Sequence, residues 1–159
     1  MATVRDVMDR LVAVIEGATP DTPAYMGAST FRHLAGTNMS EDALDMASPT
    51  RRFLFSPTGG RDVIGVMGAA GSPVEVEQEF ALEVLYRSGT SAWEMFKVVA
   101  EDVDRVGWQL MRPADWQQAT TRIFNVTVKG YSFEPPEDAN DVGVCTIPVI
   151  VHYRPSFTG

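Results

Sequence analysis

The residues of this chain that are best suited to acid–base or nucleophilic chemistry are few and far apart. The 159 residues include two histidines, His33 and His152, and a single cysteine, Cys145. Neither histidine has a second histidine or a cysteine at the short spacings typical of metal sites, and one cysteine cannot form an internal disulfide. We therefore expect no catalytic residue, no metal and no cofactor, and we expect Cys145 to be a buried, unreactive thiol.

Two further patterns suggest chemistry, but each has a simpler explanation. Gly65, Gly68 and Gly71 resemble a phosphate-binding loop, yet the Lys-Ser/Thr ending is absent and a predicted strand follows instead of a helix. This pattern predicts a flexible loop. Asp102 and Asp104 resemble an acid pair, but side chains two residues apart on a helix point in different directions. We expect both carboxylates to be solvated on the polar side of a helix.

A row of glutamates is harder to explain as an ordinary surface. Four of them occupy alternate positions of one segment: Glu75, Glu77, Glu79 and Glu83. Mostly apolar residues fill the positions between them, with Gln78 as the exception, and this alternation predicts a long strand with one apolar and one acidic face. Like charges at this spacing repel one another. The row is therefore either a solvated outer face or the lining of a subunit contact or pore. In the second case, three arginines are candidates for neutralising it: Arg51, Arg52 and Arg61.

Periodicity predicts the elements that position these residues. Apolar spacing near 3.6 residues predicts helices over 4–16 and about 91–112, with Thr3 and Ser91 as caps. The expected apolar face of the second helix follows Ala92, Phe96, Val99, Val103, Val106 and Leu110. Alternation of apolar and polar residues predicts strands over 51–56, 74–87, 120–133 and 142–153. Pro148 cannot donate a ladder hydrogen bond, so the last strand is expected at a sheet edge or bulged at that residue.

This order predicts one α+β domain over residues 1–159, with a mainly antiparallel sheet of about four strands and helices packed on one face. The expected order is helix, strand, strand, helix, strand, strand. Three connectors complete the chain: long loops at 17–50 and 57–72, and an acidic hairpin tip at 134–141. Within the first loop, residues 31–34 are expected to pin the chain to the core, and 40–47 to form one or two helical turns.

Composition narrows the class of protein further. Apolar residues make up 45% and charged residues 21% of the chain, as in an ordinary globular domain. The formal net charge of −8 argues against sequence-independent binding to duplex DNA, because an acidic surface repels phosphate. The sequence contains neither a long apolar span nor the basic-then-apolar start of a signal peptide, so we expect no association with a membrane.

Four segments give the chain a recognisable pattern: RRFLFS, VEVEQEFALEVLY, AWEMFKVVAEDVDRVGWQL and TRIFNVTVKGYSFEP with the following VGVCTIPVIVHYRP. Preceded by a short amphipathic helix, their order resembles that of the tail terminator proteins of long-tailed bacteriophages and gene transfer agents. It is also similar to that of the related tail-completion and head–tail joining proteins. The resemblance covers about residues 4–154 and consists of a pattern, without an invariant motif.

The resemblance implies a structural virion protein and no enzymatic activity. It implies a homo-oligomeric ring, a hexamer, that caps the tail tube, stops its polymerisation and offers a surface to the neck. The implied partners are copies of the chain itself, the tail tube protein and a head–tail connector or neck protein. DNA would pass through the pore without specific binding. The implied location is the tail or neck region of the virion, after assembly in the host cytoplasm.

Other functions remain open at this point. The chain is alternatively a head-closure, head–tail joining or minor tail protein. A second alternative is a small-molecule-binding α+β domain, in which the sheet and the 17–50 loop enclose a ligand. A third is an enzyme that uses His33 or His152 together with a carboxylate.

Overall fold

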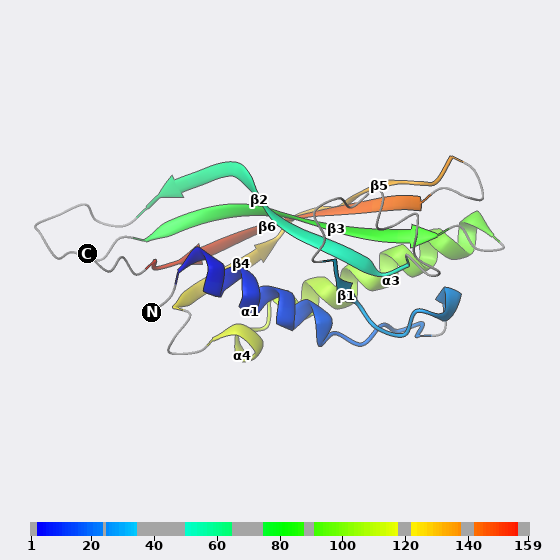
Figure 1. Cartoon of the computed structure of the whole chain (residues 1–159), viewed down its shortest axis with the longest axis horizontal. Coiled ribbons are helices and arrows are strands. Elements are labelled where there is room, and N and C mark those ends of the chain that lie inside the picture. The colour runs from blue at the N-terminus through cyan, green and yellow to red at the C-terminus, as the bar shows by residue number, and fades with distance from the viewer. Residues whose placement is uncertain are drawn as a thin grey trace, which may run out of the picture.

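The protein has an α+β fold in which helices cover one face of a mixed sheet of six strands (Figure 1). The computed structural model describes residues 3–23, 25–34, 50–64, 75–87, 91–117, 122–137 and 142–155. The helices in these ranges are α1 (Val4–Glu16), the short 3-10 helix η1 (Tyr25–Gly27), α3 (Ala92–Leu110) and α4 (Pro113–Trp116). The strands are β1 (Arg32–His33), β2 (Arg52–Val63), β3 (Val76–Arg87), β4 (Ile123–Val128), β5 (Ser132–Glu134) and β6 (Val142–Tyr153).

The sheet is built around the long antiparallel pair of β3 and β6. Its order is β1-β2-β3-β6-β4, and β5 pairs with the other half of β6. The register of the central pair runs without interruption from Val76 opposite Tyr153 to Arg87 opposite Val142. All pairs are antiparallel except β1 with β2, which are parallel. The prediction of an α+β domain with a mainly antiparallel sheet is confirmed, whereas the number of strands and their simple order are wrong.

The second strand is longer than predicted and takes in the first part of the expected 57–72 loop. A bulge between Pro57 and Arg61 accommodates the two glycines that suggested a loop. The buried Gln78 side chain stabilises this bulge, because its Nε2 donates to the carbonyls of Thr58, at 3.2 Å, and Gly60, at 3.1 Å. The two glycines thus lie in an irregular part of a strand and not in a loop, and glycine is common at β-bulges.

Pro148 lies in an interior strand, so the expectation of an edge strand is wrong. Its carbonyl accepts a 2.9 Å hydrogen bond from the backbone N–H of Lys129, directly after β4 ends. The predicted strand 120–133 is interrupted here, since β5 begins only at Ser132. The missing N–H of proline therefore falls opposite a break in the neighbouring strand, where no ladder bond is lost.

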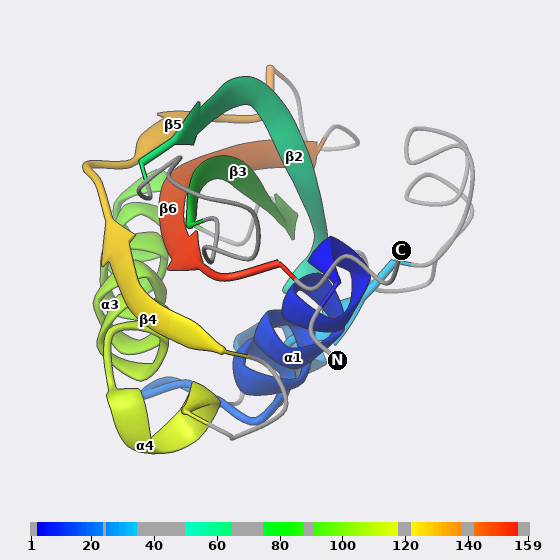
Figure 2. The ribbon, with the colours of Figure 1, turned by 90° about the vertical axis from the view of Figure 1, so that its left-hand side faces the viewer.

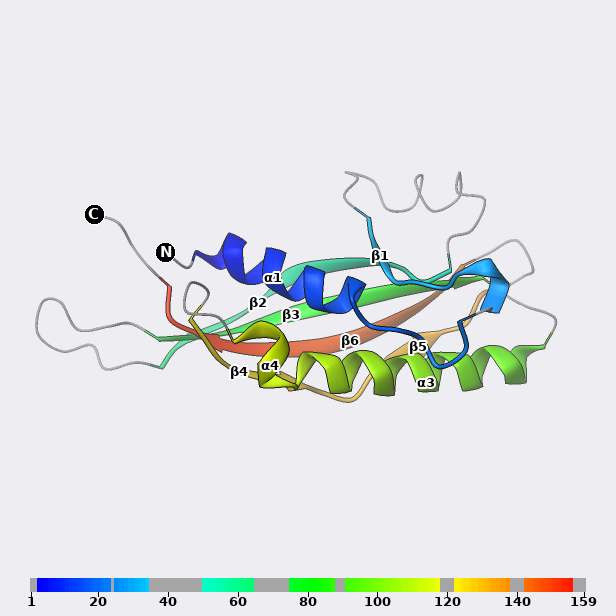
Figure 3. The same cartoon turned by 90° about the horizontal axis from the view of Figure 1, so that it is seen from below.

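The helices lie together beneath the sheet, as the end-on view and the view from below show (Figures 2 and 3). The predicted helix 4–16 is confirmed, and a capping box formed by Thr3 and Asp6 starts it. Ser91 caps α3 by accepting a hydrogen bond from the N–H of Glu94. The four buried residues of α1 are Val7, Leu11, Val14 and Ile15.

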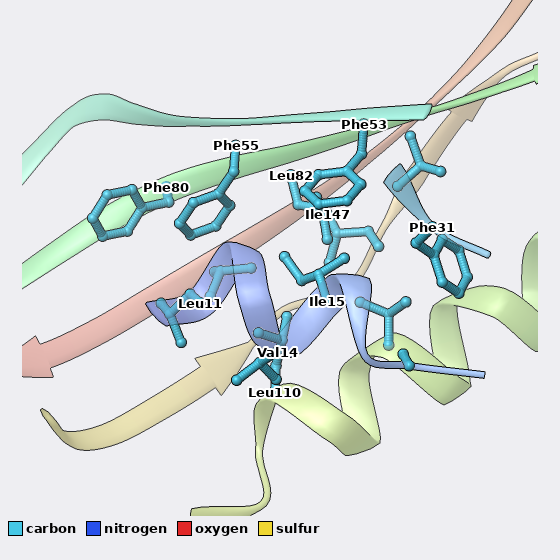
Figure 4. Packing of buried hydrophobic residues seen from close by; sticks show 14 of the residues in the cluster. Leu11, Val14, Ile15, Phe31, Phe53, Phe55, Phe80, Leu82, Leu110 and Ile147 are labelled. Atoms are coloured by element: carbon cyan, nitrogen blue, oxygen red, sulfur yellow. The ribbon is translucent and has the colours of Figure 1, made fainter. Parts of the chain in front are cut away.

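The core fills the space between these helices and the inner face of the sheet (Figure 4). Phe55 of β2 and Phe80 of β3 stack with their ring centroids 4.8 Å apart. Leu11 and Ile15 of α1 lie beneath them, each fully buried. Complete burial of such a side chain contributes about 1.5–3 kcal/mol to stability.

The first connector is pinned to the body as predicted, because Phe31 is 1% exposed and Leu34 is 6% exposed. Leu34 belongs to a second, smaller cluster with Leu85 on the opposite face of the sheet. Other predictions fall outside the described residues: the helical turns at 40–47, the glycine pattern at 65–71 and the end of the acidic tip at 138–141.

Candidate assembly surface

The predicted glutamate row lies on the face of the sheet that the helices leave open. Alternate residues of β3 are buried against the helices, while Glu77, Glu79 and Glu83 remain partly exposed between them. Asp62 of β2 stands directly opposite Glu77 and extends the row onto a second strand. Within the described part of the chain, these four carboxylates bind no other side chain. The open face thus carries a concentration of uncompensated negative charge.

Glu75 differs from the rest of the row because it has partners in its own chain. Its Oε1 accepts a 2.8 Å bond from Nη2 of Arg154, and its Oε2 lies 2.9 Å from Nε2 of His152. These contacts, that of Arg154 first, lower the pKa of Glu75 below its usual 4.5. Phe124 of β4 completes the cluster, with its ring 5.2 Å from that of His152 and 5.2 Å from the Arg154 guanidinium carbon.

Sequence reasoning missed His152 and Arg154 as partners of Glu75. A usable signal was the alternation in 142–153, which assigns Cys145 and Tyr153 to one face and hence His152 to the other. Antiparallel pairing of that strand with the glutamate strand then places His152 near Glu75. Of the two histidines, His152 is the one that meets a carboxylate, whereas His33 packs against the ring of Phe53 at 5.4 Å.

Arg51 does not reach the glutamates, so the expectation that it neutralises them is wrong. Its side chain is fully buried and donates to Asp102 through Nε at 2.8 Å and Nη2 at 3.0 Å. Its backbone has a φ of 63°, which costs a non-glycine residue about 1–2 kcal/mol. Two backbone hydrogen bonds hold Arg51 in this conformation. Its N–H donates to the Leu85 carbonyl at 2.7 Å, and its carbonyl accepts from the Arg32 N–H at 3.1 Å.

The prediction that Asp102 is a solvated helix charge is also wrong, because its side chain is 1% exposed. Besides the two bonds from Arg51, it accepts one of 2.9 Å from the hydroxyl of Tyr86. Burial raises the pKa of Asp102, against the opposing effect of Arg51. Cys145 is buried, as predicted, and burial raises the pKa of its thiol to about 12.

The other two candidate arginines lie on different faces. Arg61 stands opposite Gln78, whose side chain points to the covered face, so Arg61 does not share a face with the glutamates. Arg52 does share their face and stands directly opposite Arg32 of β1. Arg52 and Arg32 both line a polar pocket of about 200 Å³, and neither forms an ion pair in the described ranges. Among the three candidates, Arg52 alone remains available to a carboxylate on the open face.

The three tryptophans divide between the core and the surface. Trp116 is buried and donates through Nε1 to the Leu110 carbonyl at 2.7 Å. Trp93 and Trp108 of α3 are 69% and 51% exposed. Large exposed aromatic side chains are typical of contact surfaces, where they contribute most of the binding energy.

Comparisons with known proteins give no family for this chain. No family model matches it, and no curated protein shows significant similarity to it. In the described ranges, no group of three or more acidic, histidine or cysteine side chains converges as a metal site would require. None of the described helices combines the length and apolarity needed to cross a bilayer.

Proposed function

We propose that this protein is a structural virion subunit that assembles with copies of itself into a ring and serves as the tail terminator of a long-tailed bacteriophage or gene transfer agent. The observation that carries the proposal is the open edge of the sheet. β1 pairs with Arg52 and Phe53 alone, so the remaining ten residues of β2 have a described neighbour only in β3. Such an edge binds further chains readily, and a closed ring satisfies it by symmetry.

The acidic open face supports the same proposal. The carboxylates of Glu77, Glu79 and Glu83, which have no side-chain partner among the described residues, repel DNA phosphates. DNA would therefore slide through a pore lined by this face. Six copies, contacts with the tail tube on one side and with a neck or connector protein on the other, and a place in the tail region of the virion follow from the resemblance of the sequence to tail terminators.

Charge reversal tests whether the acidic face takes part in assembly. We expect Glu77→Lys with Glu79→Lys to weaken self-association about tenfold or more, which corresponds to about 1.4 kcal/mol. Analytical ultracentrifugation over a concentration series measures the effect. Asp9→Lys with Glu16→Lys is the matched control, since it makes the same change in charge at exposed positions of α1. Equal association of all three proteins would remove the acidic face from the interface.

Particles that lack the protein test its place in the virion. Without a terminator, tails are expected to be overlong or unfinished in electron micrographs. Filled heads beside separate tails of normal length would instead identify a head-closure or joining protein. Normal tails joined to normal heads would contradict both functions and would be compatible with a minor tail protein.

The contact of His152 with Glu75 favours acid–base catalysis as a second candidate function. A carboxylate that orients a histidine is a common component of general-base sites, and the two side chains are accessible, each 28% exposed. His152→Gln is the decisive variant. If the protein were an enzyme, this substitution would abolish its function in particle assembly or infection, whereas a structural subunit with the substitution would still form rings and functional tails.

A further inference from the structure

The polar pocket of about 200 Å³ lies where β1 runs beside the start of β2 (Figure 1). Its polar lining consists of Ser29, Thr30, Arg32, Thr50 and Arg52, and two small residues complete it. Two of these side chains carry a positive charge, three carry a hydroxyl group, and none is a carboxylate. Pockets for drug-sized ligands have volumes of about 300–1,000 Å³. This pocket therefore has room for one small polar group and not for a large ligand.

The two arginines of the pocket repel each other. Arg32 and Arg52 stand directly opposite each other on neighbouring strands, and like charges in such a position are destabilising. Neither side chain forms a hydrogen bond or an ion pair within the described ranges. Other arginines of the chain each bind a carboxylate: Arg51, Arg105, Arg112 and Arg154. The pocket thus contains two cations whose charge no described side chain offsets.

The acidic row of the open face does not extend into this pocket. Glu83, the member of the row that follows Leu85 on the way along β3 to the glutamates, stands opposite Leu54, two residues beyond Arg52 on β2. It does not line the pocket, and it forms no ion pair with Arg52. The charged groups of the open face are therefore segregated, and the pocket keeps a net positive charge.

Further hydrogen-bond donors line the pocket. Thr50 is 2% exposed, and its Oγ1 accepts a 3.1 Å hydrogen bond from the backbone N–H of Arg87. The hydroxyl proton of Thr50 has no acceptor among the described residues. The backbone N–H groups of Ser29 and Thr30 likewise donate to no described group. Guanidinium, hydroxyl and N–H donors are the groups that bind the oxygens of an anion.

The chain segments that form the pocket are held in place. The N–H of Arg32 donates to the Arg51 carbonyl at 3.1 Å, which fixes β1 against the chain that leads into β2. The buried Arg51 side chain also donates through Nη1 to the Ala28 carbonyl at 2.5 Å, which fixes the segment before β1. Phe31 anchors the same segment in the core. A site that is already ordered loses little entropy when a ligand binds.

We propose that this pocket binds a phosphoryl group, either as inorganic phosphate or as the end of a small phosphomonoester. Such a group carries a charge of about −1.5 to −2 at pH 7, which matches two guanidinium groups, and it offers at least three acceptor oxygens. A carboxylate has one charge and two oxygens, so it would leave part of the positive charge uncompensated. A long polyanion is disfavoured, because the glutamates on the same face repel it. The inference goes beyond the proposed function and does not depend on the ring.

Isothermal titration calorimetry with inorganic phosphate tests the proposal. Adenosine monophosphate and acetate, at the same ionic strength, are titrated in separate experiments. We expect one phosphate to bind per chain, and acetate to bind more weakly. Arg32→Gln with Arg52→Gln is expected to weaken phosphate binding about tenfold or more, because it removes both charged donors. Arg5→Gln with Lys129→Gln makes the same change in net charge at exposed positions and is expected to bind phosphate normally.

Circular dichroism confirms that the variants fold, and Arg32→Gln alone, at an exposed position, replaces the double variant if that one does not. Tighter binding of adenosine monophosphate than of phosphate would identify a phosphomonoester as the ligand, and the reverse order would identify the free ion. An unchanged chain that does not bind phosphate, an arginine variant that binds it equally well, or acetate that binds as tightly would each overturn the proposal. A chain that forms no ring can still bind phosphate, so the two proposals fail independently.

Discussion

Each side of the sheet holds a carboxylate in contact with an arginine, and these two pairs differ in burial. On the covered side, the Asp102 and Arg51 side chains are 1% and 0% exposed. On the open side, Glu75 and Arg154 are 28% and 31% exposed. Burial raises the pKa of Asp102, whereas the hydrogen bonds from Arg154 and His152 lower the pKa of Glu75. The pKa of a carboxylate beside an arginine is thus raised in the buried pair and lowered in the partly exposed pair.

This difference gives the two pairs opposite effects on stability as pH changes. The folded pKa of Glu75 lies below its unfolded value of 4.5, so its contribution is present above about pH 4.5 and is lost as pH falls through the folded pKa. The folded pKa of Asp102 lies above 3.8, so stability decreases as pH rises from 3.8 through that folded value. A buried ion pair of this kind fixes the position of its elements more than it adds net stability.

The largest effect is expected from breaking the buried pair. Asp102→Ala leaves the Arg51 charge buried without a partner, which costs about 3–5 kcal/mol of unfolding free energy. Urea denaturation measures the loss, and Asp104→Ala on the exposed side of the same helix is the control, with an effect within about 0.5 kcal/mol. If Asp102→Ala fails to fold, the double variant Arg51→Met with Asp102→Leu is expected to recover folding. A loss below about 1 kcal/mol would contradict the inferred cost of the unpaired charge.

A smaller loss is expected from adding a methyl group at a tight contact on the covered face. A Cβ at Gly143 of β6 would lie 2.9 Å from Cζ of Phe133 and 2.9 Å from Cδ of Pro136. Gly143→Ala is therefore expected to cost about 1–3 kcal/mol, measured by thermal or urea denaturation. Gly59→Ala is the control, because nothing lies within 4 Å of its Cβ position. Equal stability of the two variants would show that Phe133 and Pro136 move aside freely.

The bulge of β2 offers a third test, of about 1 kcal/mol. Gln78→Met keeps the volume of the buried side chain but removes the donor shared by the carbonyls of Thr58 and Gly60. We expect faster amide hydrogen exchange at residues 59–62 together with the small loss of stability. Gln117→Met, at an exposed position, is the control. Unchanged exchange would mean that β2 holds its bulge without Gln78.

The smallest effect is expected on the open face, and it depends on pH. Glu75→Gln removes the ionised partner of Arg154 and His152, so it is expected to lower the melting temperature slightly at pH 7. The difference from the unchanged chain is expected to shrink as pH falls from about 4.5 through the lower folded pKa of Glu75, where the folded protein itself binds the proton. Calorimetry at several pH values measures this trend. A difference that grows as pH falls below 4.5 would refute the assignment of the effect to the carboxylate charge.

Periodicity predicted α1, β6 and most of β3, because these elements keep one face buried along their whole length. For α3 it correctly predicted that Val99, Val106 and Leu110 are buried, but it placed the N-terminal part of the buried face wrongly. Phe96 is 42% exposed, while Met95 and Val98 are buried. A signal was present, since Asp102 lies at helical spacing between Val99 and Val106, in the middle of a buried stripe. No such signal exists for Arg51, the partner of Asp102. Arg51 directly precedes β2 and is far from Asp102 in sequence, so only the folded chain brings the two side chains together.

The candidate assembly surface was also predicted only in part. Alternation correctly assigned the glutamates to one face of a strand, because side-chain direction is a local property. Their neighbours depend on how separate strands pair, and a single sequence does not specify that register. Arg51 and Arg61 were therefore grouped with Arg52 by closeness in sequence, although the structure places them in the core and on the opposite face. The proposed function of the surface involves further chains, and local patterns in one sequence do not reveal such contacts.

The proline in the middle of β6 has a consequence for the behaviour of the protein at high concentration. Because the chain beside Pro148 is interrupted after Val128, the border of the sheet on this side consists of two short pieces, β4 and β5. Fibrils grow when identical long borders stack on one another without limit. A molecule with one long border and one broken border has no matching pair to stack in this way. Copies of the protein at high concentration would accordingly be protected from amyloid-like growth.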